Sequence, residues 1–255
     1  MIKFFRNIRT SLLREGKTGK YLKYALGEIV LVVIGILIAL QINNWNENRK
    51  LQIEKSKLID AMIFDFTNTE ELLKITLTDV GKQLDYMNLF YEEVTQPHQG
   101  ITVDSLKYLM TSFFQGHSFK PNLSSYYEAQ STGKLGLLHN KELLSELTQF
   151  LQSLDGFDQM REISLNTYFM GPTWEFRKEQ GSLAGFTKGS NGPKIRPHRS
   201  LTYDEIVAEA LKPQNTATLE NAFILNMNIY NNIKTMLGHT QRIIDLLKKM
   251  KEEKR

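Results

Sequence analysis

The chain has 255 residues, a net charge of +4 and no cysteine. The lack of cysteine excludes disulfides, thiolate metal sites and cysteine nucleophiles, and the length suits one membrane helix plus one domain of ordinary size. Residues 1–23 carry seven Lys or Arg against only Glu15, a local charge of +6, which leaves −2 of the total for the other 232 residues. This distribution favours an anionic membrane surface over nucleic acid as the partner of the basic segment.

Residues 1–23 are predicted to be a cytoplasmic basic segment. Within the first 14 positions, Phe4, Phe5, Ile8 and Leu12 recur at helical spacing between basic residues. This pattern indicates a short amphipathic helix lying on the inner membrane face. The alternative is a basic tail without regular structure that only sets the topology.

A transmembrane helix is predicted over residues 24–42. Ile29 to Leu40 is an unbroken run of twelve apolar residues, and the whole segment contains one charge, Glu28. At 1.5 Å per residue it would extend roughly 28 Å, which is enough to cross the hydrocarbon core of a bilayer. A cleaved signal peptide is the competing interpretation, but no small-x-small cleavage site follows Leu40.

The charges at the two ends of this segment predict its orientation. Seven Lys or Arg precede it, and four follow it within a similar distance. The excess favours a cytoplasmic N-terminus and a domain over residues 43–255 on the other side of the membrane. Trp45 is predicted to anchor the helix end at the membrane interface.

One face of the predicted span carries Glu28, Gly35 and Ala39, which are seven and four residues apart. Gly35 and Ala39 form a small-xxx-small pattern, which lets helices approach closely. A self-associating face with Glu28 pointing inward is one hypothesis. The other is that Glu28 lies about one turn inside the cytoplasmic boundary and extends its carboxylate to it.

A long helix is predicted beyond Trp45. Apolar residues recur in steps of three, four or seven from Leu58 to Val94, interrupted only at Thr69, and Pro97 and Gly100 end the pattern. No turn signal separates this helix from the membrane span. The two are therefore expected to be continuous.

The rest of the chain also shows helical patterns, and no credible run of alternating strand residues. Asn140 suits an N-cap, and Thr202 with Glu205 forms a capping box. The expected helices are Val103–Phe114, Ser124–Ser131 closed by Gly133, 141 to about 169, 202–212 and about 218–251. The predicted fold class is all-α, with the transmembrane helix continuing into an extended, mostly antiparallel helical bundle.

Residues 181–200 are rich in Gly and Pro and contain no acidic residue. They are predicted to form a loop, and long loops often carry function. Its basic residues are candidate contacts to an anionic partner: Lys188, Lys194, Arg196 and Arg199. A surface loop without a partner is the alternative.

No motif identifies a catalytic site. The five histidines are scattered without metal-ligand spacing, and no phosphate-binding or nucleophile motif is present. We therefore expect a non-enzymatic protein with no cofactor and no metal. Tyr126 and Tyr127 with Trp174 are candidate pocket residues, although aromatic residues on helix faces more often belong to the core.

Two segments carry a resemblance to a known family. KYLKYALGEIVLVVIGILIALQINNWNENRK, residues 20–50, resembles the opening of an uncharacterised Bacteroidota single-pass membrane-protein family, a domain of unknown function numbered 6090. STGKLGLLHNKELLSEL, residues 131–147, resembles its second recurring segment. The resemblance implies a single-pass envelope protein of a Gram-negative bacterium and supplies no catalytic residue. Gly27-Glu28 and the stretch from Gln41 to Trp45 match the family pattern.

The leading hypothesis is a membrane-anchored scaffold, accessory subunit or sensor. Its expected partners are the lipid bilayer, further copies of itself through the span and the helix at 45–95, and an envelope protein, but not nucleic acid. The rival hypothesis is an ion-conducting or transport assembly in which a ring of Glu28 side chains lines the path. A periplasmic enzyme of unfamiliar type is a third.

Overall fold

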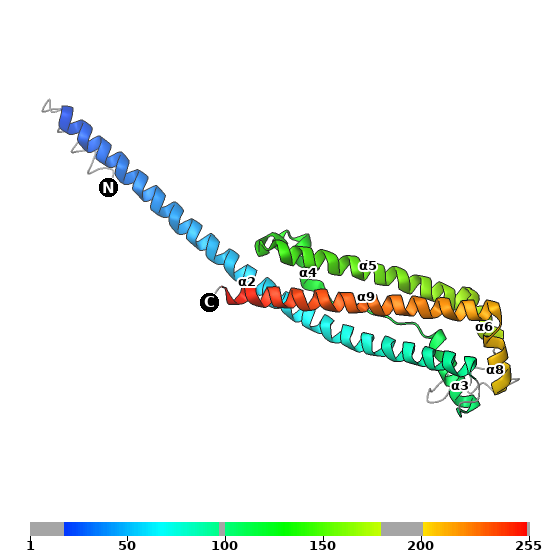
Figure 1. Ribbon diagram of the computed structural model, residues 1–255. Helices are drawn as coiled ribbons and strands as arrows, with labels where there is room; N and C mark the ends of the chain where they lie inside the picture. Colours follow the sequence, from blue (N-terminus) through cyan, green and yellow to red (C-terminus); the bar gives the residue numbers. More distant parts are fainter. Residues whose placement is uncertain (1–17, 97–99, 180–200, 254–255) are drawn as a thin grey trace, which may run out of the picture. The chain divides into compact units, whose positions relative to one another are not determined.

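The computed structural model describes residues 18–96, 100–179 and 201–253 (Figure 1). The amphipathic segment predicted before Thr18 and the basic loop residues from Lys188 to Arg199 lie outside these ranges. The described residues form helices and no strand, as predicted. The chain is divided into two compact units, Met1–Lys57 and Leu58–Arg255.

The first helix, α2, spans Thr18–Thr95 without a break, which confirms the predicted continuity. Its 78 residues include no proline, the residue that most strongly interrupts a helix. The first unit contains its apolar part, and the second unit begins at Leu58 within the same helix. After Thr95 the helix ends, close to the predicted stop at Pro97.

The remaining elements belong to the second unit, and the fold class is all-α as predicted. They are α3 (Val103–Met110), η1 (Thr111–Phe114), α4 (Ser124–Ser131), η2 (Lys134–Leu138), α5 (Lys141–Met170), α6 (Pro172–Glu179), α8 (Tyr203–Ala210) and α9 (Pro213–Glu252).

Local sequence signals begin several of these helices. The Asn140 side chain accepts a hydrogen bond from the Leu143 backbone N–H, 3.0 Å away, at the start of α5. Thr202 and Glu205 form both arms of the predicted capping box at α8. Gly133 has a φ of 73°, a left-handed conformation that favours glycine, where α4 ends.

Two prolines begin helices. Pro172 and Pro213 each occupy the first helical position, of α6 and α9 respectively. Proline suits this position because its missing N–H would have no partner there and its φ is already helical. Helix α6 was therefore missed, and α9 begins five residues earlier than the predicted Thr218.

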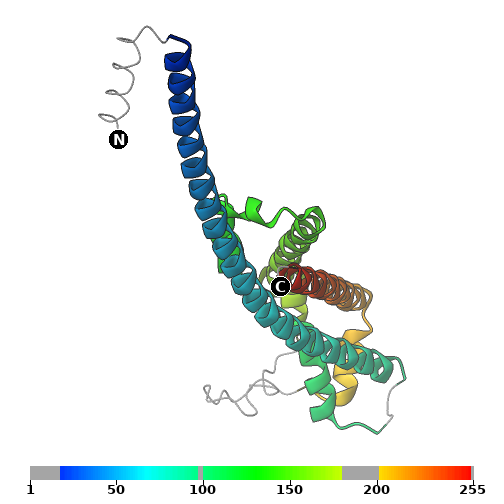
Figure 2. The same cartoon turned by 90° about the vertical axis from the view of Figure 1, so that its left-hand side faces the viewer.

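Helices α2 and α9 run antiparallel within the second unit, with a constant register. Three contacts mark this register. The carboxylate of Asp60 lies 2.7 Å from the ammonium of Lys251, and the amide nitrogen of Gln241 donates to the carboxylate of Glu70 at 3.1 Å. A Cβ added to Gly81 would lie 3.5 Å from Cε2 of Tyr230. Helices α5 and α9 also run in opposite directions, as the ribbon shows (Figures 1 and 2). The predicted antiparallel packing is thus observed for both pairs.

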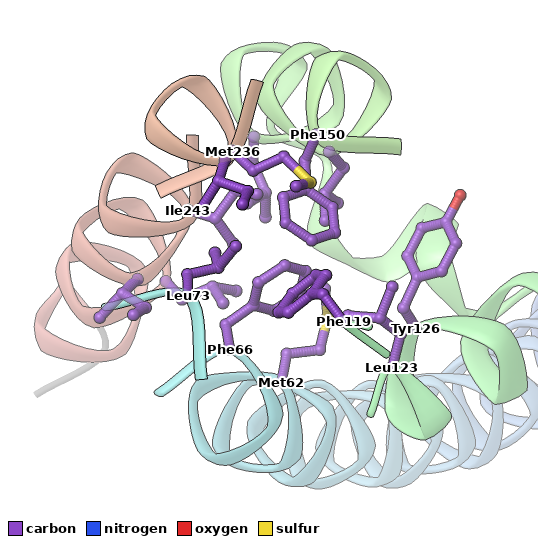
Figure 3. Packing of buried hydrophobic residues seen from close by; sticks show 14 of the residues in the cluster. Met62, Phe66, Leu73, Phe119, Leu123, Tyr126, Phe150, Met236 and Ile243 are labelled. Carbon is purple, nitrogen blue, oxygen red and sulfur yellow. The ribbon is translucent and has the colours of Figure 1, made fainter. Parts of the chain in front are cut away.

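A hydrophobic core fills the space between α2, α5 and α9 (Figure 3). The rings of Phe66 on α2 and Phe150 on α5 meet edge to face, with centroids 5.6 Å apart, and Met236 of α9 packs in the same cluster. Burying a large apolar side chain fully stabilises the fold by roughly 1.5–3 kcal/mol. The predicted apolar stripes of the long helices therefore face this core.

A second buried cluster joins the end of α2 to α3, η1, α6, α8 and α9. Phe90 of α2 packs edge to face on Phe113, with ring centroids 5.4 Å apart, and Phe176 of α6 is buried in the same cluster. Helix α6 contributes to the core mainly through this one phenylalanine. Its eight residues are too few for a long apolar stripe, so hydrophobic periodicity did not predict this helix.

Candidate functional site

The apolar part of α2 is exposed along its whole length. Every Leu, Ile and Val from Leu26 to Ile42 has between 46% and 64% of its surface exposed. Among the described residues, α2 is the one helix long and apolar enough to cross a membrane, and none of its most apolar stretch is buried. A core helix of a water-soluble domain would be covered, so the exposure points to a membrane anchor.

The predicted association residues lie on this exposed part of α2. A Cβ placed on Gly35 would meet no atom within 4 Å, and Ala39 is exposed. Glu28 is partly buried. Their spacing places the three residues on one helical face, which leaves Gly35 and Ala39 open to a neighbouring helix.

Trp45 lies three residues beyond the predicted span and is 63% exposed. The guanidinium of Arg49 lies 6.0 Å from the centre of its ring, a cation–π distance. An amphipathic ring next to a basic side chain is typical of the place where a helix leaves the hydrocarbon core of a bilayer at the headgroup level.

In the second unit, one buried acidic residue joins two helices. Glu146 of α5 is 7% exposed, and its Oε2 lies 2.7 Å from Nδ1 of His239 on α9. The guanidinium of Arg242 donates to its other oxygen at 3.3 Å. Burial alone would raise the pKa of Glu146, but the hydrogen bonds from His239 and Arg242 outweigh burial and lower that pKa.

A buried amide makes a second polar link. Gln83 of α2 is 2% exposed; its amide nitrogen donates to the carbonyl oxygen of Ser112 at 2.5 Å and to that of Gln115 at 3.2 Å. Its carbonyl oxygen is hydrogen-bonded to Nε2 of His117. Burial lowers the pKa of His117, although the charge of Asp79 opposes this shift. Gln83 thus holds the segment after η1 against α2.

Glu146 links α5 to α9, and Gln83 links α2 to η1 and to the segment after it. The pairings of Glu146 and Gln83 could not be predicted from the sequence, because each depends on how distant segments pack and has no local signal. No group of three or more His, Cys, Asp or Glu within the described ranges is placed to hold a metal ion. Tyr126 belongs to the core, and Trp174 stacks on Arg177, with the guanidinium 5.5 Å from its ring centre.

A cavity of about 430 Å³ lies between the end of α5, the start of α6, the first half of α9 and the residues around Gln115. No acidic or basic side chain lines it. Apolar side chains form most of its wall, among them Phe113, Ile163, Ala222 and Leu225. The hydroxyl of Thr173, a lining residue only 2% exposed, has no hydrogen-bond partner among the described residues. No local pattern in the sequence predicted this cavity.

Comparison with known proteins identifies a family. Residues 28–154, about half of the chain, match the model of a family of unknown function, DUF6090. The chain belongs to this family. The match begins at Glu28 and includes the rest of α2 and the first part of α5, so the predicted membership of this family of unknown function is confirmed. No curated protein and no solved structure matches the chain.

Proposed function

We propose that this member of the family is a non-enzymatic, single-pass envelope protein of the bacterial inner membrane. Residues 24–42 cross the bilayer, the N-terminus is cytoplasmic and the helical bundle is periplasmic, where it acts as a scaffold, accessory subunit or sensor. The observation that carries this proposal is the uncovered apolar part of α2. Its exposed side chains would be stable in lipid and unstable in water.

The distribution of charge supports the proposed orientation. Seven Lys or Arg precede the span and favour retention of that end in the cytoplasm. The chain has no cysteine, so a bundle in the oxidising periplasm would carry no thiol that could form a wrong disulfide.

The polar chemistry of the bundle supports a non-enzymatic role. Glu146 with His239, and Gln83 with His117, are carboxylate or amide pairs of the kind that also occur in active sites. Here each pair joins two segments of the fold, and none of the four residues lines the cavity. Their hydrogen bonds contribute to helix packing, about 0.5–3 kcal/mol each depending on charge.

A second face of α2 supports self-association. Phe64 and Ile75, 64% and 61% exposed, lie eleven residues or three helical turns apart, and Leu72 beside them is 43% exposed. The core lies on the opposite side of the helix, where Met62 and Phe66 are buried. The proposed occupant of this face is a second copy of the chain, because copies held in one membrane share an orientation and a high effective concentration.

Membrane insertion and orientation are tested together in intact cells. Because the chain lacks cysteine, Gln130→Cys on α4 and Ser11→Cys before the span each give a unique thiol. We expect the protein to resist alkaline extraction. A membrane-impermeant maleimide should label Gln130→Cys in spheroplasts, and Ser11→Cys only after lysis. Release by alkali, or the opposite labelling pattern, would contradict the proposal.

A further inference from the structure

One exposed side of α9 lacks charged residues. No residue from Asn221 to Ile233 is charged, although 24% of the whole chain is. Exposed residues of this stretch recur in steps of three and four and therefore share one side of the helix: Asn221, Ile224, Asn228 and Asn231. Charged side chains usually contribute to the water-facing side of a surface helix. Their absence here is the pattern expected where another protein covers the helix.

Helix α5 carries a matching series. Its members also follow steps of three and four, and all but the glycine are exposed: Gln152, Gly156, Gln159, Ile163, Asn166 and Met170. Ile163 and Met170 are 56% and 78% exposed, and Ile224 on α9 is 49% exposed. Three charged residues flank the two series without belonging to them: Asp155, Glu220 and Lys234. The centres of protein interfaces are likewise poor in charge, so the two series together, which we call the amide face, have the composition of an interface.

The two series lie next to each other. Ile163 and Ile224 line the same cavity, so they are at the same level of the two antiparallel helices. A Cβ added to Gly156 would lie 3.2 Å from the amide nitrogen of Asn232, which shows how closely α5 and α9 pack beyond the cavity. At the level of Ile163 and Ile224 the cavity gives the amide face a hollow with a mostly apolar wall, into which a side chain of a partner could insert.

A second copy of the chain suits this face because the face is complementary to itself. Amide groups both donate and accept hydrogen bonds, so a surface rich in Asn and Gln can pair with an identical surface. A surface carrying net charge would instead repel its own copy. A two-fold axis parallel to α5 and α9 would bring α5 of each copy beside α9 of the other, in opposite directions. The four helices would then form a bundle with antiparallel neighbours, to which seams in steps of three and four are suited.

We propose that two copies pair through the amide face, with Ile163 of each copy against Ile224 of the other. The direction of pairing rests on the proposed membrane anchoring. Both copies enter the second unit at Leu58, and only an axis parallel to the helices keeps the two Leu58 ends on the same side of the pair. The amide face is separate from the exposed side of α2 around Phe64 and Ile75, so this pairing adds a second contact between copies.

The size of the amide face predicts a weak contact. From Gln152 to Met170 a helix rises about 27 Å, and two helices side by side are about 20 Å wide, a footprint of roughly 540 Å². A standard interface buries about 800 Å² on each partner. Pairing should therefore depend on the high effective concentration of copies held in one membrane.

Cross-linking between copies in one membrane tests the pairing. Because the chain has no cysteine, a copy with one introduced cysteine can be cross-linked only to another molecule. Copies carrying Ile163→Cys and copies carrying Ile224→Cys, with different tags, are co-expressed and treated with a short bis-maleimide. We expect at least tenfold more mixed dimer than from Asp158→Cys with Ile224→Cys. Asp158 is an exposed residue of the same helix but lies about 140° around it from Ile163.

An added charge gives a second measurement. Asn231→Lys places a positive charge on the amide face of each copy and should reduce the mixed cross-link at least fivefold. Gln130→Lys, an exposed change on α4, should leave it unchanged. Equal yields from the Ile163→Cys and Asp158→Cys pairs, or no effect of Asn231→Lys, would overturn the proposal. More Ile163→Cys homodimer than mixed dimer, or cross-linking mainly to a different protein, would overturn it as well.

Two further measurements separate this pairing from the proposed function. Alkaline extraction reports membrane anchoring, and cross-linking between Ile75→Cys copies reports contact through α2. If the chain stays in the membrane and Ile75→Cys copies cross-link while the mixed pair does not, pairing through the amide face alone is wrong. If alkali releases the chain, the proposed membrane anchoring fails, and with it the direction of pairing.

Discussion

Asp65 of α2 caps a helix that begins 59 residues later in the chain. Its Oδ2 accepts hydrogen bonds from the Ser125 backbone N–H at 2.9 Å and from the Ser124 hydroxyl at 3.3 Å, both in the first turn of α4. The residue before this turn, Leu123, has no side chain able to cap it. The carboxylate of Asp65 therefore accepts the hydrogen bond of the Ser125 N–H group from another helix. Its negative charge also interacts favourably with the positive N-terminal end of the α4 dipole.

Replacement of Asp65 by Ala should therefore lower the free energy of unfolding by about 1–3 kcal/mol, since it removes a cap and leaves a buried N–H unpaired. Asp65→Asn keeps an acceptor oxygen and should lose less. Urea unfolding of the full chain in detergent, followed by circular dichroism, measures both. Asp60→Ala, at an exposed ion pair, is the control and should change stability by less than about 1 kcal/mol. Equal effects of Asp65→Ala and Asp60→Ala would contradict the capping role.

The lowered pKa of Glu146 predicts a pH dependence of stability. A carboxyl whose pKa is lower in the folded chain than its ordinary value of 4.5 stabilises the fold above that value, and this contribution is lost as the pH falls through the folded pKa. Glu146→Gln should cost about 1.5–3 kcal/mol at pH 7, and the difference from the unmodified chain should shrink below pH 4.5.

Urea midpoints at pH 7 and at steps below pH 4.5 measure this difference. Glu162→Gln, an exposed change on the same helix, should remain within about 0.5 kcal/mol of the unmodified chain. If the difference in urea midpoint between Glu146→Gln and the unmodified chain stays constant across the whole pH range, the carboxylate charge contributes nothing to stability.

The turn between α5 and α6 requires a glycine. A Cβ on Gly171 would lie 2.9 Å from both Cα and the carbonyl oxygen of Thr167, which are backbone atoms that cannot rotate away. Gly171→Ala should destabilise the fold by about 1–3 kcal/mol through overpacking. Gly136→Ala, where no atom lies within 4 Å of the added Cβ, is the matched control. Thermal unfolding that shows equal shifts for the two would reject the steric explanation.

Self-association through the span predicts sensitivity at Gly35. Gly35→Leu fills the small-residue face with a bulky side chain and should shift the oligomer towards monomer, by about 1 kcal/mol or more of association free energy. Gly27→Leu makes the same change away from that face, also with open space around its Cβ, and serves as the control. Light scattering or cross-linking in mild detergent reports the oligomer. The same assembly in both variants would remove this face from the interface.

The rival ion-conducting assembly is tested by conductance. Under the proposed function, the chain reconstituted in planar bilayers should pass no current above the lipid background. A channel lined by Glu28 would give cation currents that Glu28→Gln reduces, because neutralising a ring of carboxylates removes the attraction for cations. Such currents would replace the proposed function with transport.

The sequence predicted those features whose signals are local. Asn140 and Thr202 reveal helix starts because each caps its own helix, and the apolar spacing of α2 reveals which face is buried. Pro172 was ambiguous, since proline both follows helices and begins them. The burial of Thr69 was also not predictable, because a polar residue that interrupts an apolar stripe is ordinarily assigned to the surface. Thr69 is nevertheless fully buried, and its hydroxyl donates to the Asp65 carbonyl oxygen 2.9 Å away.

The cavity and the polar pairs were beyond prediction for a different reason. Glu146 and His239 are 93 residues apart, and only the antiparallel packing of α5 and α9 brings them together. An acidic residue at that position of an amphipathic helix would ordinarily be assigned to the solvent side. The cavity likewise depends on how the end of α5, the start of α6 and the first half of α9 leave space between them.

The register between α2 and α9 has a topological consequence. Lys251 contacts Asp60, so almost the last turn of the chain lies against the first turn of the second unit, and the intervening 190 residues form a nearly closed ring. The ion pair between these two exposed side chains closes that ring without a covalent bond. Conversely, loss of the C-terminal turn would open the ring at the place where the bundle begins on α2.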